Sequence, residues 1–539
     1  MTERSLPRWS LGIPALLAVV VHAITLGNGF VFDDLEAIRD NPVVQDGFPP
    51  SGLLARDFWG RVPGTLGSVG TWRPLVVLTL WLDRHLGGGR PFAFHLSNLI
   101  FHAFAVTALT IAIDRRLRDR RIAVTAGALF AVFAIGTEGV ASIVGRADTL
   151  AAGFGFLAFA LLPARDRTVR IRDGIGVALA LFAALLCKEA AIATPVWIAL
   201  AEGSLSSDLD SRGRRSRVAL VIGATAAAIA LYLAVRLPAF GGTHSLARSY
   251  NNNPLLGQGL GVRILTALRL LGMSMQLTLV PLQLAPDYSF AEIMPSRSLL
   301  DGGVVVGLVM LAALVTLAVF FARRTPGVTV AIAMFLVPWF VVSNVVVLLP
   351  TIFAERLLYA PVAGIAVLIA LAIGALQSRD RGALAATLVV VLVIANGARS
   401  VWRDLDWHDP RALFAQAVID TPRCARAWEN LGAAMMEARQ PERALRALET
   451  SVQIAPDWGA PYALLGGVRD ELGDAAGAEQ ALRRAVRLDP ALGSGYFNLT
   501  IFLLRHGRRD DATDAVRAGL RVRPNDTRLL RLARELGQR

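Results

Sequence analysis

Long apolar runs divided by short, arginine-rich segments constrain the fold of this chain more than any other feature. Several runs approach the roughly 20 residues that a helix needs to cross the hydrocarbon of a bilayer. Of all residues, 54% are hydrophobic and only 18% are charged. The predicted spans are residues 11–26, 92–113, 122–135, 140–162, 174–187, 190–201, 218–237, 302–322, 328–350, 357–376 and 383–398. The sequence therefore predicts an all-α, polytopic membrane bundle of about 11 spans.

The arginines between these runs predict an orientation. With the N-terminus inside, the clusters at 115–121, 165–172, 212–217, 323–324 and 379–381 all face the cytoplasm, as the positive-inside rule requires. This holds only if segment 263–284 is interfacial or re-entrant, because a full crossing there would invert every later loop. The net charge of +13 then reflects membrane topology, and no nucleic-acid partner is expected. Almost all of this charge is arginine, as in GC-rich bacterial genes, so we expect a bacterial inner membrane protein.

The C-terminal part follows a different pattern, with prolines every 34 residues at Pro422, Pro456, Pro490 and Pro524. An aromatic residue, a leucine and an alanine recur at the same interval. A period of 34 residues with these features is the tetratricopeptide helix-turn-helix signature. We therefore predict a membrane domain over 1–400 and a tetratricopeptide-repeat α-solenoid over 401–539, outside the membrane. It would hold three full repeats at about 423–524 and a C-terminal cap helix over 526–539.

Several kinds of site are missing from the sequence. The two cysteines, Cys187 and Cys424, exclude a disulfide framework and a cysteine-based metal site. There is no glycine-rich loop of nucleotide-binding type, and there is no His-x-x-x-His or Cys-x-x-Cys spacing. No metal and no cofactor are therefore predicted.

Charged residues gather in the segments that this topology places outside. Asp33 and Asp34 directly follow the first span. Ionised groups near hydrocarbon are costly unless they are hydrated, paired or used in a function. Taken singly, most such residues are more often structural: Asp33 could be a turn residue and Arg356 a snorkelling anchor. The candidate site residues are Asp33, Asp34, Arg73, Glu138, Arg146, Asp148, Lys188, Glu189, Glu355, Arg356 and Tyr359. Their convergence on one side predicts a site at the outer membrane interface.

The chemistry that suits such a site is sugar transfer from a lipid-linked donor. A soluble nucleotide is not available outside a bacterial membrane, whereas a polyprenyl-phosphate donor arrives through the bilayer. Its phosphate is acidic enough to leave without a general acid, but it needs fixed positive charge, which arginine supplies bidentately. The acceptor hydroxyl needs a carboxylate as base. One carboxylate and one or two arginines are therefore sufficient.

The sequence resembles the transmembrane-and-tetratricopeptide-repeat O-mannosyltransferases and their bacterial relatives over nearly its whole length. Asp406-Trp407, which introduces the repeats, fits this family as well. The matching motifs, in the family's order, are Asp33-Asp34 with Asn41, Trp72-Arg73-Pro74-Leu75, Pro91-Phe-Ala-Phe-His95-Leu96-Ser-Asn98, Thr137-Glu138, Gly145-Arg146-Ala-Asp148, Cys187-Lys188-Glu189, Pro286-Asp287-Tyr288-Ser289 and Ala354-Glu355-Arg356-Leu-Leu-Tyr359.

The resemblance implies a GT-C membrane fold and an inverting transfer of mannose from a polyprenyl-phosphate donor to Ser/Thr of an exported protein. It makes Asp33 or Asp34 the base and Arg356 with Arg146 the donor-phosphate contacts. The remaining candidates, Arg73, Glu138, Asp148, Lys188, Glu189, Glu355 and Tyr359, would shape the site. The family often carries two histidines before Thr-Glu, where this chain has Phe133 and Gly136, which weakens a His-dependent or metal-assisted step.

Three functions remain open from the sequence. The first is a protein O-mannosyltransferase whose repeats recruit the protein acceptor. The second is a lipid-linked-sugar transferase that acts on a glycan or a lipid. The third is a non-catalytic scaffold or transporter that docks partners through its repeats, although the acidic pair lies in an outer loop and no two-fold hydropathy repeat is visible.

Overall fold

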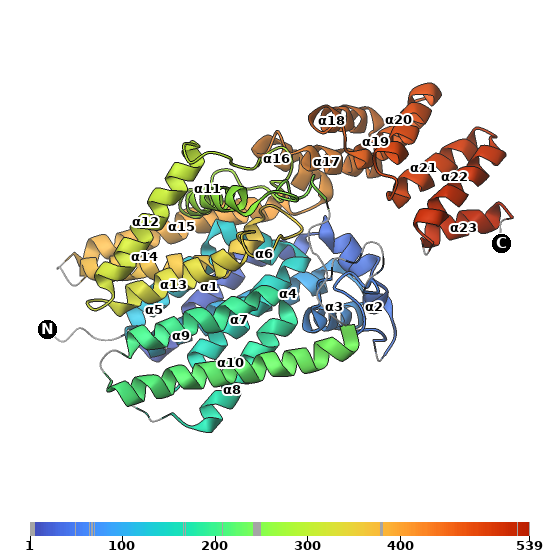
Figure 1. Cartoon of the computed structure of the whole chain (residues 1–539). Helices are drawn as coiled ribbons and strands as arrows, with labels where there is room; N and C mark the ends of the chain where they lie inside the picture. The colour runs from blue at the N-terminus through green and yellow to red at the C-terminus, as the bar shows by residue number, and fades with distance from the viewer. Residues whose placement is uncertain are drawn as a thin grey trace. The chain divides into compact units, whose positions relative to one another are not determined.

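The computed structural model describes residues 6–48, 50–63, 65, 68, 70–164, 167, 169–206, 209–240, 249–377, 381–524 and 526–537. These residues form helices and connecting segments without any β-strand, so the predicted all-α class is confirmed for them (Figure 1). Arg165 and Arg379, from two of the arginine clusters, lie outside the described residues. The chain divides into two compact units: residues 1–248, 255–286 and 295–409 form the first, and residues 249–254, 287–294 and 410–539 form the second.

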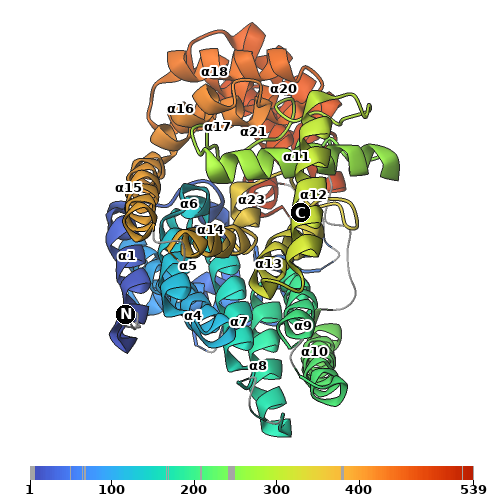
Figure 2. The same ribbon diagram turned by 90° about the vertical axis from the view of Figure 1, so that its left-hand side faces the viewer.

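The first unit is a bundle of helices, many of which run side by side (Figures 1 and 2). Its α-helices are α1 Ile13–His22, α2 Pro42–Gln45, α3 Pro74–Leu86, α4 Pro91–Leu117, α5 Arg120–Val132, α6 Thr137–Ala141, α7 Arg146–Leu161, α8 Ile171–Cys187, α9 Ala193–Leu205, α10 Ser211–Phe240, α11 Leu260–Leu279, α12 Gly302–Phe321, α13 Pro326–Val341, α14 Val362–Gln377 and α15 Gly382–Asp406. Short helical turns lie at Arg8–Gly12, Ala23–Gly27, Leu35–Arg39, Ala134–Gly136, Ile143–Gly145, Glu189–Ile192 and Glu355–Leu358.

Seven helical segments of the described chain are long and apolar enough to cross a membrane. They are Arg8–Gly27, Pro91–Leu117, Ile143–Leu161, Ser211–Phe240, Leu260–Leu279, Gly302–Phe321 and Gly382–Asp406. The pair Arg120–Val132 and Ala134–Ala141, bent by 56°, gives an eighth if it counts as one span. Shorter apolar helices at Pro326–Val341 and Val362–Gln377 cover parts of two further predicted spans. The multi-pass architecture is therefore present, and the number of about 11 spans stays a prediction.

Helix α11 covers most of the segment 263–284, and the interfacial or re-entrant placement of that segment stays a prediction. It is one continuous helix of 20 residues, long and apolar enough to cross. Its polar residues, which suggested otherwise, have partners: Ser274 and Thr278 donate to carbonyls one turn back, and Trp339 donates to Ser274. At its start Arg263 donates to the carbonyls of Asn344 and Val345. Such satisfied groups are tolerated within an apolar bundle.

Two of the arginine clusters meet at one end of the bundle. Arg116 of α4 and Arg217 of α10 both pair with the buried carboxylate of Glu202 in α9. Both guanidinium groups also donate to the carbonyl of Pro163, over 3.0 Å in each case. These two clusters therefore lie at the same end of the helices, as the predicted topology requires.

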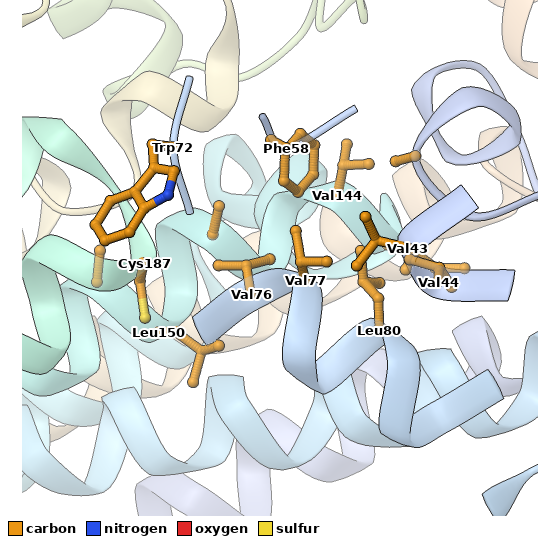
Figure 3. Close-up of a cluster of buried hydrophobic side chains, with 14 of the residues drawn as sticks. Val43, Val44, Phe58, Trp72, Val76, Val77, Leu80, Val144, Leu150 and Cys187 are labelled. Carbon is orange, nitrogen blue, oxygen red and sulfur yellow. The ribbon is translucent and has the colours of Figure 1, made fainter. Parts of the chain in front are cut away.

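The first outer loop, which joins the predicted spans 11–26 and 92–113, contains α2 and α3 and has its own apolar core. Figure 3 shows Trp72 and the α3 residues Val76, Val77 and Leu80 packed with Val43 and Val44 of α2 and with Leu150 of α7. The indole of Trp72 is fully buried and contacts Tyr232 of α10 with 5.4 Å between ring centroids. This core fixes the loop that carries the acidic pair.

Close backbone contact joins α13 and α14 through Gly364. A Cβ atom added there would collide with the carbonyl oxygen of Ala331 and would lie 2.6 Å from the backbone nitrogen of Phe335. Small residues at helix contacts allow this approach in membrane proteins, where dispersion rather than water exclusion drives helix association.

We expect Gly364→Ala to lower the free energy of unfolding by about 1–3 kcal/mol, because backbone atoms cannot move aside for the methyl group. The control is Gly223→Ala in the interior of α10, where the new methyl group meets nothing within 4 Å. Alanine there is expected to be neutral or slightly stabilising. Thermal unfolding of the detergent-solubilised protein measures both variants, and equal melting temperatures would contradict the packing argument.

The second unit is an array of antiparallel helix pairs (Figure 1). Its helices are α16 Pro410–Asp420, α17 Ala425–Glu437, α18 Pro441–Ile454, α19 Gly459–Glu471, α20 Ala475–Leu488, α21 Gly493–Arg505, α22 Arg509–Val522 and α23 Thr527–Glu535. The three pairs from α17 to α22 fall on the predicted repeats, and α23 stands where the cap helix was expected. The C-terminal part of this unit starts at Pro410 rather than near residue 401, because α15 continues to Asp406.

A short segment between α11 and α12 also belongs to this second unit. The backbone nitrogen of Ala291 donates to Arg423 over 3.0 Å, and that of Ala425 donates to Phe290 over 2.8 Å. Asp287 pairs with Arg426 at 3.3 Å. The Pro286-Asp287-Tyr288-Ser289 motif therefore supplies an acid that is used within the repeat unit.

Candidate active site

The acidic pair lies in a tight turn that sends its two carboxylates in different directions. Phe32, directly before the pair, has a φ of +53°, a left-handed conformation that is uncommon for a bulky residue. The chain then enters the short helical turn Leu35–Arg39. The Asp33 side chain keeps 18% of its surface exposed, whereas Asp34 is fully buried.

Asp34 ties the loop to the start of α7. One carboxylate oxygen accepts from the backbone nitrogen of Val31 over 3.2 Å, and the other accepts from that of Val144 over 3.1 Å. Burial raises the pKa of Asp34 from 3.8 to about 7, although these two hydrogen bonds favour the charged form. Asp34 is therefore well placed to hold the loop and poorly placed to reach a substrate.

This pKa predicts a pH dependence of stability. Between about pH 4 and pH 7 the folded state holds a proton on Asp34 that the unfolded chain has lost, so stability falls as pH rises through this range. The full effect is on the order of 4 kcal/mol. In Asp34→Asn, residue 34 does not titrate. We expect the melting temperature of the unaltered protein minus that of Asp34→Asn to be larger at pH 5 than at pH 8. A difference that is the same at both pH values would contradict this assignment.

Asp33, Glu138 and Arg356 converge from three distant parts of the chain. The Nη2 atom of Arg356 lies 3.2 Å from a carboxylate oxygen of Asp33. On its other side, Nη1 lies 2.8 Å from Oε1 of Glu138, which is fully buried in α6. The backbone nitrogen of Arg356 donates to Oε2 of the same carboxylate over 2.8 Å. Glu138 therefore holds Arg356 at two points, which fixes the direction of its guanidinium group.

Two further charge pairs lie around this centre. Lys188 Nζ contacts Asp148 Oδ1 at 2.5 Å, and both side chains keep 10% of their surface exposed. Arg73 contacts Glu189 at 3.4 Å, and Glu189 also accepts the backbone N–H of Trp72 over 2.8 Å. Lys188 interacts electrostatically with Arg73 and Arg356, and Glu138 does so with Asp148, so the pairs form one charged cluster.

A largely apolar cavity opens beside Asp148 and Lys188. It runs between α7, α9 and α13, where Phe156, Trp197 and Met334 line it. Leu357 and Pro361, which follow Arg356 in the chain, also line it. The charged cluster and a space for an apolar group thus share one wall.

The structure places Arg146 away from any open space. Its side chain is fully buried, and each guanidinium nitrogen has a partner: Asn98 accepts from Nε over 2.9 Å, Asp83 from Nη1 over 2.6 Å and the Phe94 carbonyl from Nη2 over 2.9 Å. This geometry favours a role in joining α3, α4 and α7 over the expected contact with a donor phosphate.

Glu355 and Tyr359 support the site from behind. Glu355 is fully buried, accepts the backbone N–H of Ala285 over 2.6 Å and lies 3.8 Å from Arg403. The Tyr359 hydroxyl lies 2.6 Å from Nδ1 of His102. Its ring packs against Gly139, where an added Cβ atom would lie 2.8 Å from a ring carbon of Tyr359. These contacts hold the segments that present Arg356 and Glu138.

Sequence reasoning missed a buried polar chain behind the cluster. His22 of α1 pairs with Asp404 of α15 at 2.9 Å, and its ring packs edge-on against His102 of α4. Arg403, next to Asp404, pairs with Asp406 at 3.0 Å. A histidine inside an apolar run was the available signal, since polar side chains there are expensive unless paired.

No group of three or more His, Cys, Asp or Glu side chains is arranged to hold a metal ion in the described part of the chain. The charged cluster is instead a set of alternating acids and cations. Such an arrangement can bind an anion on Arg356 or Lys188 and accept a proton on Asp33.

Comparisons with known proteins point to one family, although no family model matches the chain. The chain is 26% identical to protein O-mannosyl-transferase TMTC3 of Mus musculus and 27% identical to its Homo sapiens counterpart, in both cases over 92% of this chain and 58% of the relative. It is 37% identical to Tmtc2 of Drosophila melanogaster over 53% of this chain and 31% of the relative. The chain thus spans little more than half the length of the first two relatives.

Solved structures give only distant similarity. The MamA protein matches with a TM-score of 0.21 and 22% identity over 24% of this chain and 71% of its own. The APC/C hetero-tetramer Cut9-Hcn1 matches with a TM-score of 0.24 and 11% identity over 85% of this chain and 92% of its own. Neither match adds to the description of the fold. The resemblance predicted from the motifs is nevertheless confirmed by the curated relatives, and the chain is a homologue of the TMTC protein O-mannosyl-transferases.

Proposed function

We propose that this protein is a membrane-bound glycosyltransferase that moves mannose from a polyprenyl-phosphate donor to Ser/Thr hydroxyls of exported proteins. The observation that carries the proposal is the contact of Arg356 with both Asp33 and Glu138. A cation fixed by a buried acid, with a partly exposed carboxylate beside it, is the minimum that this transfer requires. The names of the curated relatives support the choice of sugar and acceptor.

In the proposed reaction Asp33 is the general base and Arg356 binds the donor phosphate. The acceptor hydroxyl oxygen attacks the anomeric carbon of the mannose, and its proton passes to Asp33. The bond between the anomeric carbon and the phosphate oxygen breaks, and its electron pair leaves on the polyprenyl phosphate. Arg356 neutralises that charge, and Lys188 adds a second cation at the cavity. Attack opposite to the leaving group inverts the configuration of the sugar.

The cavity beside Lys188 suits the lipid part of this donor. Its walls are mainly apolar side chains of α7, α9 and α13, and Asp148 and Lys188 are among the residues that line it. A phosphate near Lys188 and Arg356 would leave an isoprenoid chain facing these walls. We propose that the site and the repeat unit are extracytoplasmic and that the repeats recruit the acceptor protein.

Reconstitution tests the proposal directly. The purified protein in liposomes is given radiolabelled polyprenyl-phosphate mannose and an unstructured peptide rich in Ser and Thr. We expect labelled peptide with the mannose on a hydroxyl oxygen, identified by mass spectrometry. Label that accumulates only in a lipid or polysaccharide fraction would favour the glycan or lipid acceptor instead. No consumption of the donor by the folded protein would reject a transferase function.

A further inference from the structure

The repeat unit has hollows that recur along one of its faces. The first lies over Trp428 and Leu431 of α17, with Arg446 of α18 at its edge. The second lies over Tyr462 and Leu465 of α19, with Arg484 and Arg487 of α20 at its edge. A third lies between α22 and α23.

The 34-residue period shows that these hollows occupy equivalent positions. Tyr462 in the second hollow stands 34 residues after Trp428 in the first, and Leu465 stands 34 residues after Leu431. Leu530 in the third hollow stands two periods after Tyr462. Because consecutive repeats stack with a constant rotation, equivalent positions lie on one face of the array. The three hollows therefore form one row, which we call the repeat groove.

The charge of the repeat groove is strongly one-sided. Its lining contains eight arginines but one acidic residue, Glu449. Residues 410–539 hold 16 acidic side chains, so the acids are almost all placed elsewhere. Arg446 and Arg487 are exposed, and the guanidinium of Arg484 lies over the ring of Tyr462 at 4.7 Å. The groove thus combines apolar or aromatic floors with an excess of fixed positive charge.

We propose that the repeat groove binds extended, acidic segments of polypeptide, with side chains in successive hollows and carboxylates on the arginines. This inference rests on the proposed function, because it names the kind of acceptor sequence that the repeats recruit. Arginine pairs with carboxylates in a planar, bidentate geometry and also stacks on aromatic rings. Separate hollows, one and then two repeats apart, suit the side chains of an extended chain, whereas an anionic membrane surface would need a flat basic face.

The test uses the full-length protein in neutral detergent and a fluorescein-labelled, unstructured peptide of Glu, Ser, Ala and Leu. The comparison peptide replaces each Glu with Gln. By fluorescence anisotropy we expect the Glu peptide to bind about tenfold more tightly than the Gln peptide at low salt, and the difference to shrink as NaCl is raised. Equal affinities for the two peptides would overturn the proposal.

A matched pair of variants locates the binding. We expect the double variant Arg446→Glu with Arg487→Glu to bind the Glu peptide about tenfold more weakly. The control, Arg509→Glu with Arg531→Glu, makes the same charge change at exposed positions outside the hollows and is expected to change affinity less than twofold. Equal losses in both variants would show a general charge effect and reject the groove. Vesicles containing phosphatidylglycerol, mixed with each variant, test the membrane alternative. If the groove variant loses vesicle binding but keeps peptide binding, the proposed binding of acidic polypeptide by the repeat groove is rejected.

Transfer activity separates this inference from the proposed function. With a short neutral Ser/Thr peptide as acceptor, the groove variant is expected to keep the unaltered protein's rate, because Arg446 and Arg487 are not in the charged cluster. With an acidic acceptor, we expect its KM to rise about tenfold and its kcat to stay unchanged. A protein that binds the acidic peptide but transfers no sugar would remove the enzyme proposal and leave the groove assignment standing.

Discussion

Replacing Asp33 by asparagine is expected to lower the rate of mannosyl transfer by roughly a hundredfold to ten-thousandfold, the usual contribution of a general base. Asp33 is the partly exposed member of the acidic pair, and its carboxylate lies 3.2 Å from the guanidinium that would hold the donor phosphate. A proton taken up there is therefore close to the developing phosphate charge. Asparagine has nearly the same shape but cannot accept the proton. The measurement is the initial rate of label transfer to a Ser/Thr peptide by the reconstituted protein.

Two neighbours in the same loop serve as controls for Asp33. Asp40→Asn removes an exposed acid and is expected to leave the rate within about twofold. Asp34→Asn removes an acceptor from the Val31 and Val144 backbone groups, so its main effect is expected on stability. If Asp33→Asn keeps full activity while Asp34→Asn folds and loses it, the two roles assigned here are reversed.

The convergence of the site was predictable from the sequence. A consistent arginine bias placed Asp33, Glu138 and Arg356 on one side of the membrane, although more than 300 residues separate the first and last. Helices pack at fixed depths in a bilayer, so residues at the ends of apolar runs must lie in the same thin layer. The structure brings these three side chains into direct contact.

Which member of a pair faces the substrate was not predictable. Asp33 and Asp34 are chemically identical, and only the fold shows that the first keeps part of its surface exposed while the second is buried. Arg146 and Arg356 differ in the same way, because only the fold shows that Asn98, Asp83 and Phe94 enclose the first.

Replacing Arg356 by glutamine is expected to lower transfer by about a hundredfold or more, because the donor phosphate loses the cation placed to meet its developing charge. Part of this loss should appear as a higher KM for the polyprenyl-phosphate donor, since Arg356 would also bind the phosphate of the ground state. Glutamine can still donate a hydrogen bond to Glu138, and the backbone nitrogen of Arg356 keeps its bond to the same carboxylate. Kinetics over a range of donor concentrations separate the two effects.

Two further variants decide whether charge or geometry carries this role. Arg39→Gln removes an exposed arginine from the first outer loop and is expected to leave the KM for the donor unchanged. Arg356→Lys keeps the charge but loses the planar fork that spans Asp33 and Glu138, so it should restore only part of the activity. Full activity in the lysine variant would mean that a point charge suffices. Normal donor KM and kcat in Arg356→Gln would place the phosphate elsewhere, and Lys188, at the wall of the same cavity, would then be the cation to test.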